Sequence, residues 1–350
     1  MKILKKETEP LLYHNFPRPN TVSVDKDSNS IGLSILRSLI EHGMLLTSED
    51  LYIPNNPRAP QSDQVENVYV QERACFTLSS RKDLFRPPAT IGKGSHFEQF
   101  GSYSIGLNPL KARELGVIPV FYFYNSVNSE NISYEILFRI REMRTILKVL
   151  AHIEAKSSLD NKLQISQQEL REIGYGLDDQ SNISKLIEKL TTESANSVLE
   201  YFSTNRVPAW NLIDWVDILL NFFQTADSKS KTNALYYYQQ REWRIVKLFA
   251  EHIQCYPIFP ATDSKYPEIE KNSLIEKLND IGGLFSRLDQ KPLSLLVGTR
   301  TKHFFDFVEE IITPKQSVKS TLKLLDEYGL IKDFKVDFKS GSHVFLKRCK

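Results

Sequence analysis

Cysteine is scarce in this chain of 350 residues, which contains only Cys75, Cys255 and Cys349. Three thiols so far apart in the sequence form neither a disulfide framework nor the ligand spacing of a zinc site. This excludes the class of small secreted domains that are held together by disulfides. We interpret the three residues as buried or incidental thiols of a protein in a reducing compartment.

Long apolar runs are also missing, and so is an excess of charge of either sign. No segment approaches the roughly 20 apolar residues that a membrane-spanning helix needs, and no apolar stretch follows the basic first residues as it would in a signal peptide. The 45 basic and 43 acidic side chains nearly balance. We therefore expect a cytoplasmic protein without membrane association, and the composition gives no general support for binding nucleic acid.

Metal and phosphate motifs are absent as well. The seven histidines lack the spacings H-x-x-x-H and H-E-x-x-H, so the sequence predicts no metal site. The segment 92–94, Gly-Lys-Gly, lacks the spacing of a phosphate-binding P-loop, and we interpret it as a flexible turn. The segment 242–244, Glu-Trp-Arg, matches only the last part of the D…E-x-K pattern of nucleases.

What the sequence does contain is a series of short β-type runs, separated by glycine and proline. They cover residues 11–16, 65–78, 103–107 and 117–124, and the last is apolar enough to predict a central buried strand. A later run begins at Arg241. The pattern predicts an α+β protein in which a helical insertion interrupts a small mixed β-sheet core.

The helices are indicated by apolar residues at spacings of three and four. Such a pattern runs from Ile31 to Ile40 and predicts a helix that ends at Gly43, and residues 316–328 predict another that ends at Gly329. Residues 332–346 alternate, which predicts a final hairpin. We divide the chain into residues 1–130 and 231–350, the two halves of one α+β domain, and a helical insertion at 131–230.

The helical insertion could be a lid, a partner-binding platform or a dimer surface, or it could be ordinary helical packing. Trp215, Leu219 and Phe222 fall on one face of a predicted helix, so the block could bind a protein partner. Arg139, Arg141, Arg144 and Lys148 form a basic helix face that could contact nucleic acid, although a solvated face explains these charges at least as well.

Glu242 is the first candidate for chemistry, because Arg241 and Arg244 flank it at the start of an apolar strand. A cation within about 4–6 Å favours the charged form of a carboxyl group. The alternative is an ordinary ion pair at a strand edge. His14, beside Asn15, could bind a ligand amide or ribose or could be a structural histidine.

Three further candidates are Arg73, His96 and Tyr103. Arg73 could hold a phosphate in bidentate fashion. His96 and Tyr103 flank a turn at Phe100 and Gly101, where backbone can approach a ligand closely. Tyr103 could stack on a base or nicotinamide ring, or it could equally be a half-exposed strand tyrosine. Cys75 lies in an apolar run in which a thiol stays protonated, so it is a poor nucleophile.

The order of four motifs resembles the AbiGi-type abortive-infection proteins of bacterial phage defence. In that family a "CFT" strand, a "G-x-Y-G-I-G-F" turn, a "PV-x-Y" strand and an "REWR" strand follow one another. The corresponding segments here are 75–77, 101–107, 119–122 and 241–244, with Ser104 in place of a glycine and Leu107 in place of a phenylalanine. The resemblance covers residues 10–125 and 230–312 and implies a role in antiphage defence.

The chain is also distantly similar to ADP-ribosyltransferase-like toxins. There, a first strand with "Y-H-I-T" precedes a short helix that ends in glycine, and a late strand carries the catalytic glutamate. The similarity implies that NAD is the substrate, with Glu242 stabilising an oxocarbenium-like state. It further implies that His14 orients the ribose and Tyr103 stacks on nicotinamide, while Arg73, His96 or Tyr103 completes the cofactor site.

Three functions therefore stay open from the sequence. The first is an NAD-dependent ADP-ribosyltransferase or NAD-cleaving effector, for which Glu242 and His14 must face one cleft. The second is a non-catalytic antitoxin or phage sensor of the same fold, for which the helical block must expose an apolar face. The third is a nucleic-acid-processing protein.

Overall fold

The computed structural model describes residues 9–17, 28–54, 66–86, 94–124, 223–226, 241–252, 256–258 and 294–349. It also describes eleven helical residues of the central block, namely 140, 143, 144, 147, 151, 197, 212, 213, 215, 216 and 219. The chain forms two compact units, the first comprising residues 1–51, 70–120 and 228–350. The second comprises residues 52–69 and 121–227, so it starts earlier than the predicted insertion and includes a segment from the first third of the chain.

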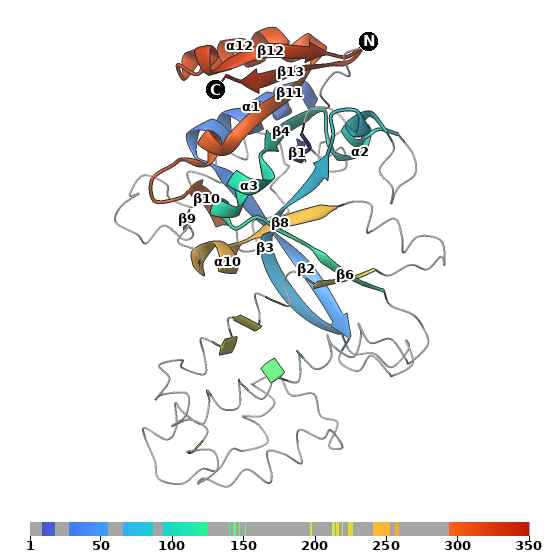
Figure 1. Ribbon diagram of the computed structural model, residues 1–350, viewed down its shortest axis with the longest axis vertical. Helices are drawn as coiled ribbons and strands as arrows, with labels where there is room; N and C mark the ends of the chain where they lie inside the picture. Colours follow the sequence, from blue (N-terminus) through green and yellow to red (C-terminus); the bar gives the residue numbers. More distant parts are fainter. Residues whose placement is uncertain are drawn as a thin grey trace, which may run out of the picture. The chain divides into compact units, whose positions relative to one another are not determined.

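Among the residues that the structure describes, the first unit holds most of the regular structure (Figure 1). Its earlier elements are β1 (Leu11–Phe16), α1 (Ser28–Glu41), η3 (Asp83–Phe85), α2 (His96–Phe100), β4 (Tyr103–Leu107), α3 (Pro109–Ala112), η4 (Arg113–Leu115) and β5 (Ile118–Pro119). It also contains most of β2 (Met44–Pro54) and β3 (Glu66–Ser79), whose residues 52–54 and 66–69 belong to the second unit. Its later elements are β8 (Glu242–Val246), α10 (Lys247–His252), β9 (Tyr256–Ile258), β10 (Ser294–Gly298), η5 (Phe304–Phe307), β11 (Val308–Pro314), η6 (Lys315–Ser317), α12 (Val318–Glu327), η7 (Ile331–Asp333), β12 (Phe334–Lys339) and β13 (His343–Arg348). The second unit contains the short strands β6 (Phe121–Tyr124) and β7 (Phe223–Ala226), which pair in parallel.

A large sheet dominates the first unit. Its strand order is β12-β13-β11-β4-β1-β3-β2-β10-β9, and β8 pairs with β3 and β5 beside this path. The sequence predicts a small mixed sheet, and this is wrong in both respects. The sheet has eleven strands in the described part of the chain, and the pairs whose register is known are antiparallel, because the last third of the chain adds β11, β13 and β12 beside β4. The α+β class itself is confirmed.

The register of the strands defines two faces of this sheet. Tyr13 pairs with Thr77, and Thr77 pairs with Glu242, so the three side chains project to the same side. We call this side the Glu242 face. Successive residues of a strand point to opposite sides, so His14 lies on the other side, which we call the His14 face.

The main hydrophobic core lies on the His14 face, under α1 and α12. It includes Leu12, Phe76, Ile105 and Ile311 from the sheet and Leu36 from α1. Helix α1 lies so close to β4 that a Cβ on Gly32 would be 2.2 Å from the ring of Tyr103. Glycine at this position therefore fixes the distance between the helix and the sheet.

A smaller core covers part of the Glu242 face. Tyr13, Ile312 and Phe345 from the sheet pack there against Leu84 from η3 and Phe97 from α2. Helix α2 starts with a capping box, in which the Ser95 side chain accepts from the amide of Glu98 and the Glu98 side chain accepts from the amide of Ser95. The two cores together hold the central strands from both sides.

Several expectations for the local structure are confirmed. Helix α1 precedes Gly43, whose φ is 102°, and α12 precedes Gly329, whose φ is 69°. The Leu330 amide donates to the carbonyl of Leu325 at 2.7 Å, which closes the end of α12. The final hairpin is formed by β12 and β13.

The expected central strand at 117–124 is wrong. The segment forms two short strands that belong to different sheets, and they meet at Val120. The first, β5, pairs with β8 alone among the described strands. Phe121 starts the second and is exposed, so the apolar character of this run does not reflect burial in a sheet centre.

Candidate functional site on the Glu242 face

Glu242 starts β8 and forms an ion pair with a residue of its own strand. The Arg244 Nε donates to Glu242 Oε1 at 2.7 Å. The Arg244 side chain is only 1% exposed, and Glu242 is mostly buried. The carboxylate therefore supplies negative charge to a guanidinium that has been taken out of water, which is a structural task.

The backbone on both sides of Glu242 is also part of the sheet. Arg241 has a φ of 46°, an uncommon value for a residue other than glycine. Its carbonyl accepts from the Leu78 amide at 3.0 Å, and the carbonyl of Glu242 accepts from the Val120 amide at 2.9 Å. These contacts fix the start of β8 between β3 and the segment after β5.

His14 and Glu242 do not share a face. The His14 ring lies 5.4 Å from the ring of Phe76, between centroids, on the side of the main core. Its Nδ1 is 2.8 Å from the carbonyl oxygen of Cys75. A carbonyl only accepts, so Nδ1 carries the proton, and the imidazole ties β1 to β3 just beyond their last paired residues. The expectation that Glu242 and His14 line one cleft is wrong for this register.

Tyr103 is not available for stacking on a ligand. Its side chain is fully buried on the His14 face, where it packs against Gly32 of α1 and stacks on Phe16 with 6.0 Å between ring centroids. Its hydroxyl donates to the carbonyl of Asn29 at 3.1 Å. The prediction that Tyr103 contacts nicotinamide is therefore wrong, because this ring is a core residue.

Arg73 lies on the same face as Glu242, and His96 lies beside that face. Arg73 pairs with Val246 and Glu242 pairs with Thr77, so the two residues are four positions apart along β3, or roughly 13 Å. Arg73 is buried. His96 is a buried residue of α2, and burial lowers the pKa of its imidazole, although Asp83 acts in the opposite direction. Of the five predicted residues, the structure thus keeps Glu242, Arg73 and His96 on one side of the sheet.

The Glu242 face also carries a buried polar network that the sequence did not predict. Glu310, 1% exposed, accepts from the Tyr13 hydroxyl at 2.8 Å and from the Arg81 Nε at 2.7 Å. Arg81 also donates to Asp337 at 2.7 Å. Burial raises the pKa of Glu310, while the Arg81 guanidinium and the Tyr13 hydroxyl lower it. The isolated Gly106 in β4 was the available signal, because a Cβ there would be 2.9 Å from the Tyr13 ring that crosses it to reach Glu310.

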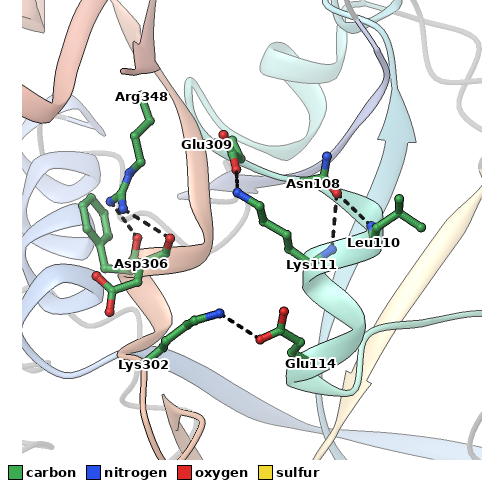
Figure 2. A network of polar contacts seen from close by, with 9 residues as sticks. Asn108, Leu110, Lys111, Glu114, Lys302, Asp306, Glu309 and Arg348 are labelled. Atoms are coloured by element: carbon green, nitrogen blue, oxygen red, sulfur yellow. Dashed lines mark hydrogen bonds and ion pairs between the residues drawn. The ribbon is translucent and has the colours of Figure 1, made fainter. Parts of the chain in front are cut away.

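A second group of polar contacts joins α3 to the start of β11 and η4 to the segment before η5 (Figure 2). Asn108 caps α3 through its Oδ1, which accepts from the Leu110 amide at 2.9 Å, and Lys111 pairs with Glu309. Lys302 pairs with Glu114 at 3.1 Å. These contacts hold α3, and they leave the neighbouring Leu110 side chain 71% exposed.

The second unit carries an exposed apolar surface. Trp215 and Leu219 are helical residues four positions apart, and their side chains are 47% and 49% exposed. Val216, between them, is buried and packs with Leu147. Residues at i and i+4 share one side of a helix, so we name Trp215 and Leu219 the Trp215 surface. Met143 of the same unit is exposed as well.

Of the predicted basic helix, only Arg144 belongs to the described residues; Arg139, Arg141 and Lys148 lie outside them, as do Cys255 and Phe222. Across the described ranges, no group of histidine, cysteine and acidic residues is arranged to hold a metal ion. In the same ranges no helix is both long and apolar enough to cross a membrane.

Comparison with known proteins gives no relative for this chain. No family model, no curated protein and no solved structure matches it.

Proposed function

We propose that this chain is a partner-binding component of a bacterial antiphage-defence system, an antitoxin or phage sensor that acts in the cytoplasm through the Trp215 surface. The proposal keeps the sequence resemblance to AbiGi-type proteins and its distant similarity to the ADP-ribosyltransferase-like fold. The observation that supports it most directly is the exposure of Trp215 and Leu219, which is the apolar helix face that the binding hypothesis requires.

The chemistry of this surface suits protein recognition. Tryptophan is enriched among the residues that dominate binding energies at interfaces, because it buries a large apolar area. Leu219 extends the same apolar side by one helical turn. A partner with an apolar cleft would remove the Trp215 and Leu219 side chains from water. Val216 and Leu147 are buried against each other within the unit.

The uses of the predicted catalytic residues also favour binding over catalysis. Glu242 balances the buried Arg244, the His14 imidazole joins β1 to the carbonyl of Cys75, and Tyr103 fills the space beneath α1. Each of these side chains therefore has a role in the fold. Glu242 and His14 act on opposite faces of the sheet.

The proposal is tested by affinity purification of the tagged chain from the bacterium that carries the system. We expect that the double variant Trp215→Ser and Leu219→Ser loses one partner protein that the wild-type chain retains. Leu110→Ser removes a more exposed leucine from the first unit and is the matched control, which should keep the partner. Retention of the same proteins by all three chains would contradict the proposal.

A second candidate, an NAD-using effector, keeps one supporting observation. The Glu242 side chain is 16% exposed at the start of β8, where its carboxylate could accept hydrogen bonds from ribose hydroxyl groups. Nicotinamide release from NAD by the purified wild-type chain, lost in a folded Glu242→Gln variant, would favour this candidate over the binding protein.

A further inference from the structure

Strand β12 is an exposed edge of the large sheet. It ends the strand order, and among the described strands it pairs with β13 alone. Every residue of β12 after Phe334 is exposed, including Val336 at 43% and Phe338 at 45%. Such an edge presents backbone N–H and C=O groups that can pair with a further strand.

The edge also carries features that discourage pairing with an arbitrary strand. Lys335 and Lys339 place charge on it, and the register with β13 shifts between Val336 and Phe338, so the backbone bulges at Asp337. A strand that offers a carboxylate to Lys335 pairs here more favourably than one that does not. The features therefore select a partner by charge.

Lys335 and Asp337 project to the same side of the sheet. Lys335 pairs with Lys347, which pairs with Glu310, so Lys335 lies on the Glu242 face. The Asp337 carboxylate accepts from Arg81, which also binds Glu310, so Asp337 lies on this face too.

The residue that faces Lys335 on β13 has the same charge. Lys347 stands directly opposite it, and like charges in a cross-strand pair repel. Within the described ranges, Lys335 forms no ion pair, and an acid on the outer side of β12 would offset the repulsion.

We propose that two copies of this chain associate through antiparallel pairing of β12 with β12, with Val336 opposite the partner's Val336. In this register Lys335 lies opposite the partner's Asp337, and two-fold symmetry produces the pair twice. A carboxylate has room for more than one donor, so Asp337 can accept from the partner's Lys335 while it keeps Arg81.

Other registers lose these pairs. A pairing centred on Lys335 sets the two copies of this lysine against each other, and one centred on Asp337 sets two aspartates opposite each other and Lys335 opposite the partner's Lys339. A shift of one position places Lys335 opposite an apolar residue and loses both ion pairs. The sequence of β12 therefore favours the register centred on Val336.

The dimer should be weak. A single strand of six residues buries less surface than a standard protein interface. We expect a monomer–dimer equilibrium that depends on concentration, and sedimentation velocity of the purified full chain measures it.

Charge reversal tests the register. Lys335→Glu places two acids opposite each other at both symmetric positions and should weaken dimerisation about tenfold or more. Asp337→Lys should do the same, whereas an equimolar mixture of the two variants should regain wild-type association, because each chain then supplies the complementary charge. Lys335→Ala leaves Arg81 and Asp337 untouched and should fall between wild type and Lys335→Glu. Lys323→Glu, on α12, is the control for net charge and should dimerise like wild type.

Two results would overturn the proposal. One is a wild-type chain that stays monomeric at about 100 μM, a concentration at which even a weak specific interface associates. The other is association that Lys335→Glu leaves unchanged, or that the mixture of folded variants fails to restore. Thermal unfolding of each variant shows whether it is folded before the comparison is made.

Discussion

The buried carboxylate of Glu310 provides the sharpest test of how the Glu242 face is held together. Substitution of Glu310 by glutamine keeps the size of the side chain and removes its charge. Arg81 then loses the charge of a partner whose side chain is 1% exposed, and the Tyr13 hydroxyl loses a charged acceptor at 2.8 Å. Breaking a buried ion pair costs about 3–5 kcal/mol, and because Arg81 keeps Asp337, we expect a loss of about 3 kcal/mol in the free energy of unfolding.

Two companion variants separate the parts of this network. Tyr13→Phe removes one hydrogen bond to a charged group and should cost about 1.5–3 kcal/mol. The double variant Glu310→Leu and Arg81→Met removes both charges together and should be less destabilised than Glu310→Gln, because no unpaired charge remains buried. Urea unfolding followed by circular dichroism gives the three values. A Glu310→Gln variant within about 0.5 kcal/mol of wild type would show that the buried charge of Glu310 does not stabilise this face.

Three further predictions concern single positions. Gly106→Ala places a methyl group 2.9 Å from the Tyr13 ring, and this overpacking should lower the free energy of unfolding by about 1–3 kcal/mol. A variant as stable in urea as wild type would show that the Tyr13 ring does not lie across Gly106. Burial lowers the pKa of His343, so the folded state binds fewer protons than the unfolded state, whose histidines titrate near about 6.5. The stability that this difference supplies is present above that pH and is lost as the pH falls below it. His343→Gln should therefore lose less thermal stability than wild type between about pH 7 and 5. An identical pH profile would show that His343 does not cause the loss. Glu242→Gln removes the charge beside Arg244 and should lower the free energy of unfolding by about 1–3 kcal/mol, whereas an unchanged value would show that the pair is not structural.

The local elements could be predicted from the sequence, because their signals lie within a few residues. The spacing of Ile31 and Leu36 sets the buried side of α1, and Gly43 and Gly329 follow helices that the apolar period indicates. The hairpin of β12 and β13 follows from alternation around the turn at 340–342. The segment 117–124 misled the prediction because its apolar residues belong to two different short strands.

The site could not be predicted in the same way, because it depends on register between distant strands. Whether His14 and Glu242 share a face is decided by the pairing of Tyr13 with Thr77 and of Thr77 with Glu242, and a shift of one residue would reverse the outcome. The contact between Tyr13 and Glu310 joins residues 297 positions apart. No periodicity within a short window carries that information.

We propose that the protein acts through the Trp215 surface, while Glu242 stabilises the fold. Phage plaque counts on bacteria that carry the complete defence system test it most directly, with wild type, Glu242→Gln, the double variant Trp215→Ser and Leu219→Ser, and Leu110→Ser compared at a temperature at which all four chains are folded. We predict that the double variant changes the plaque count at least tenfold while Glu242→Gln and Leu110→Ser protect like wild type. Loss of protection in folded Glu242→Gln, with the double variant unchanged, would show that Glu242 acts in catalysis and that the Trp215 surface is not the site of action.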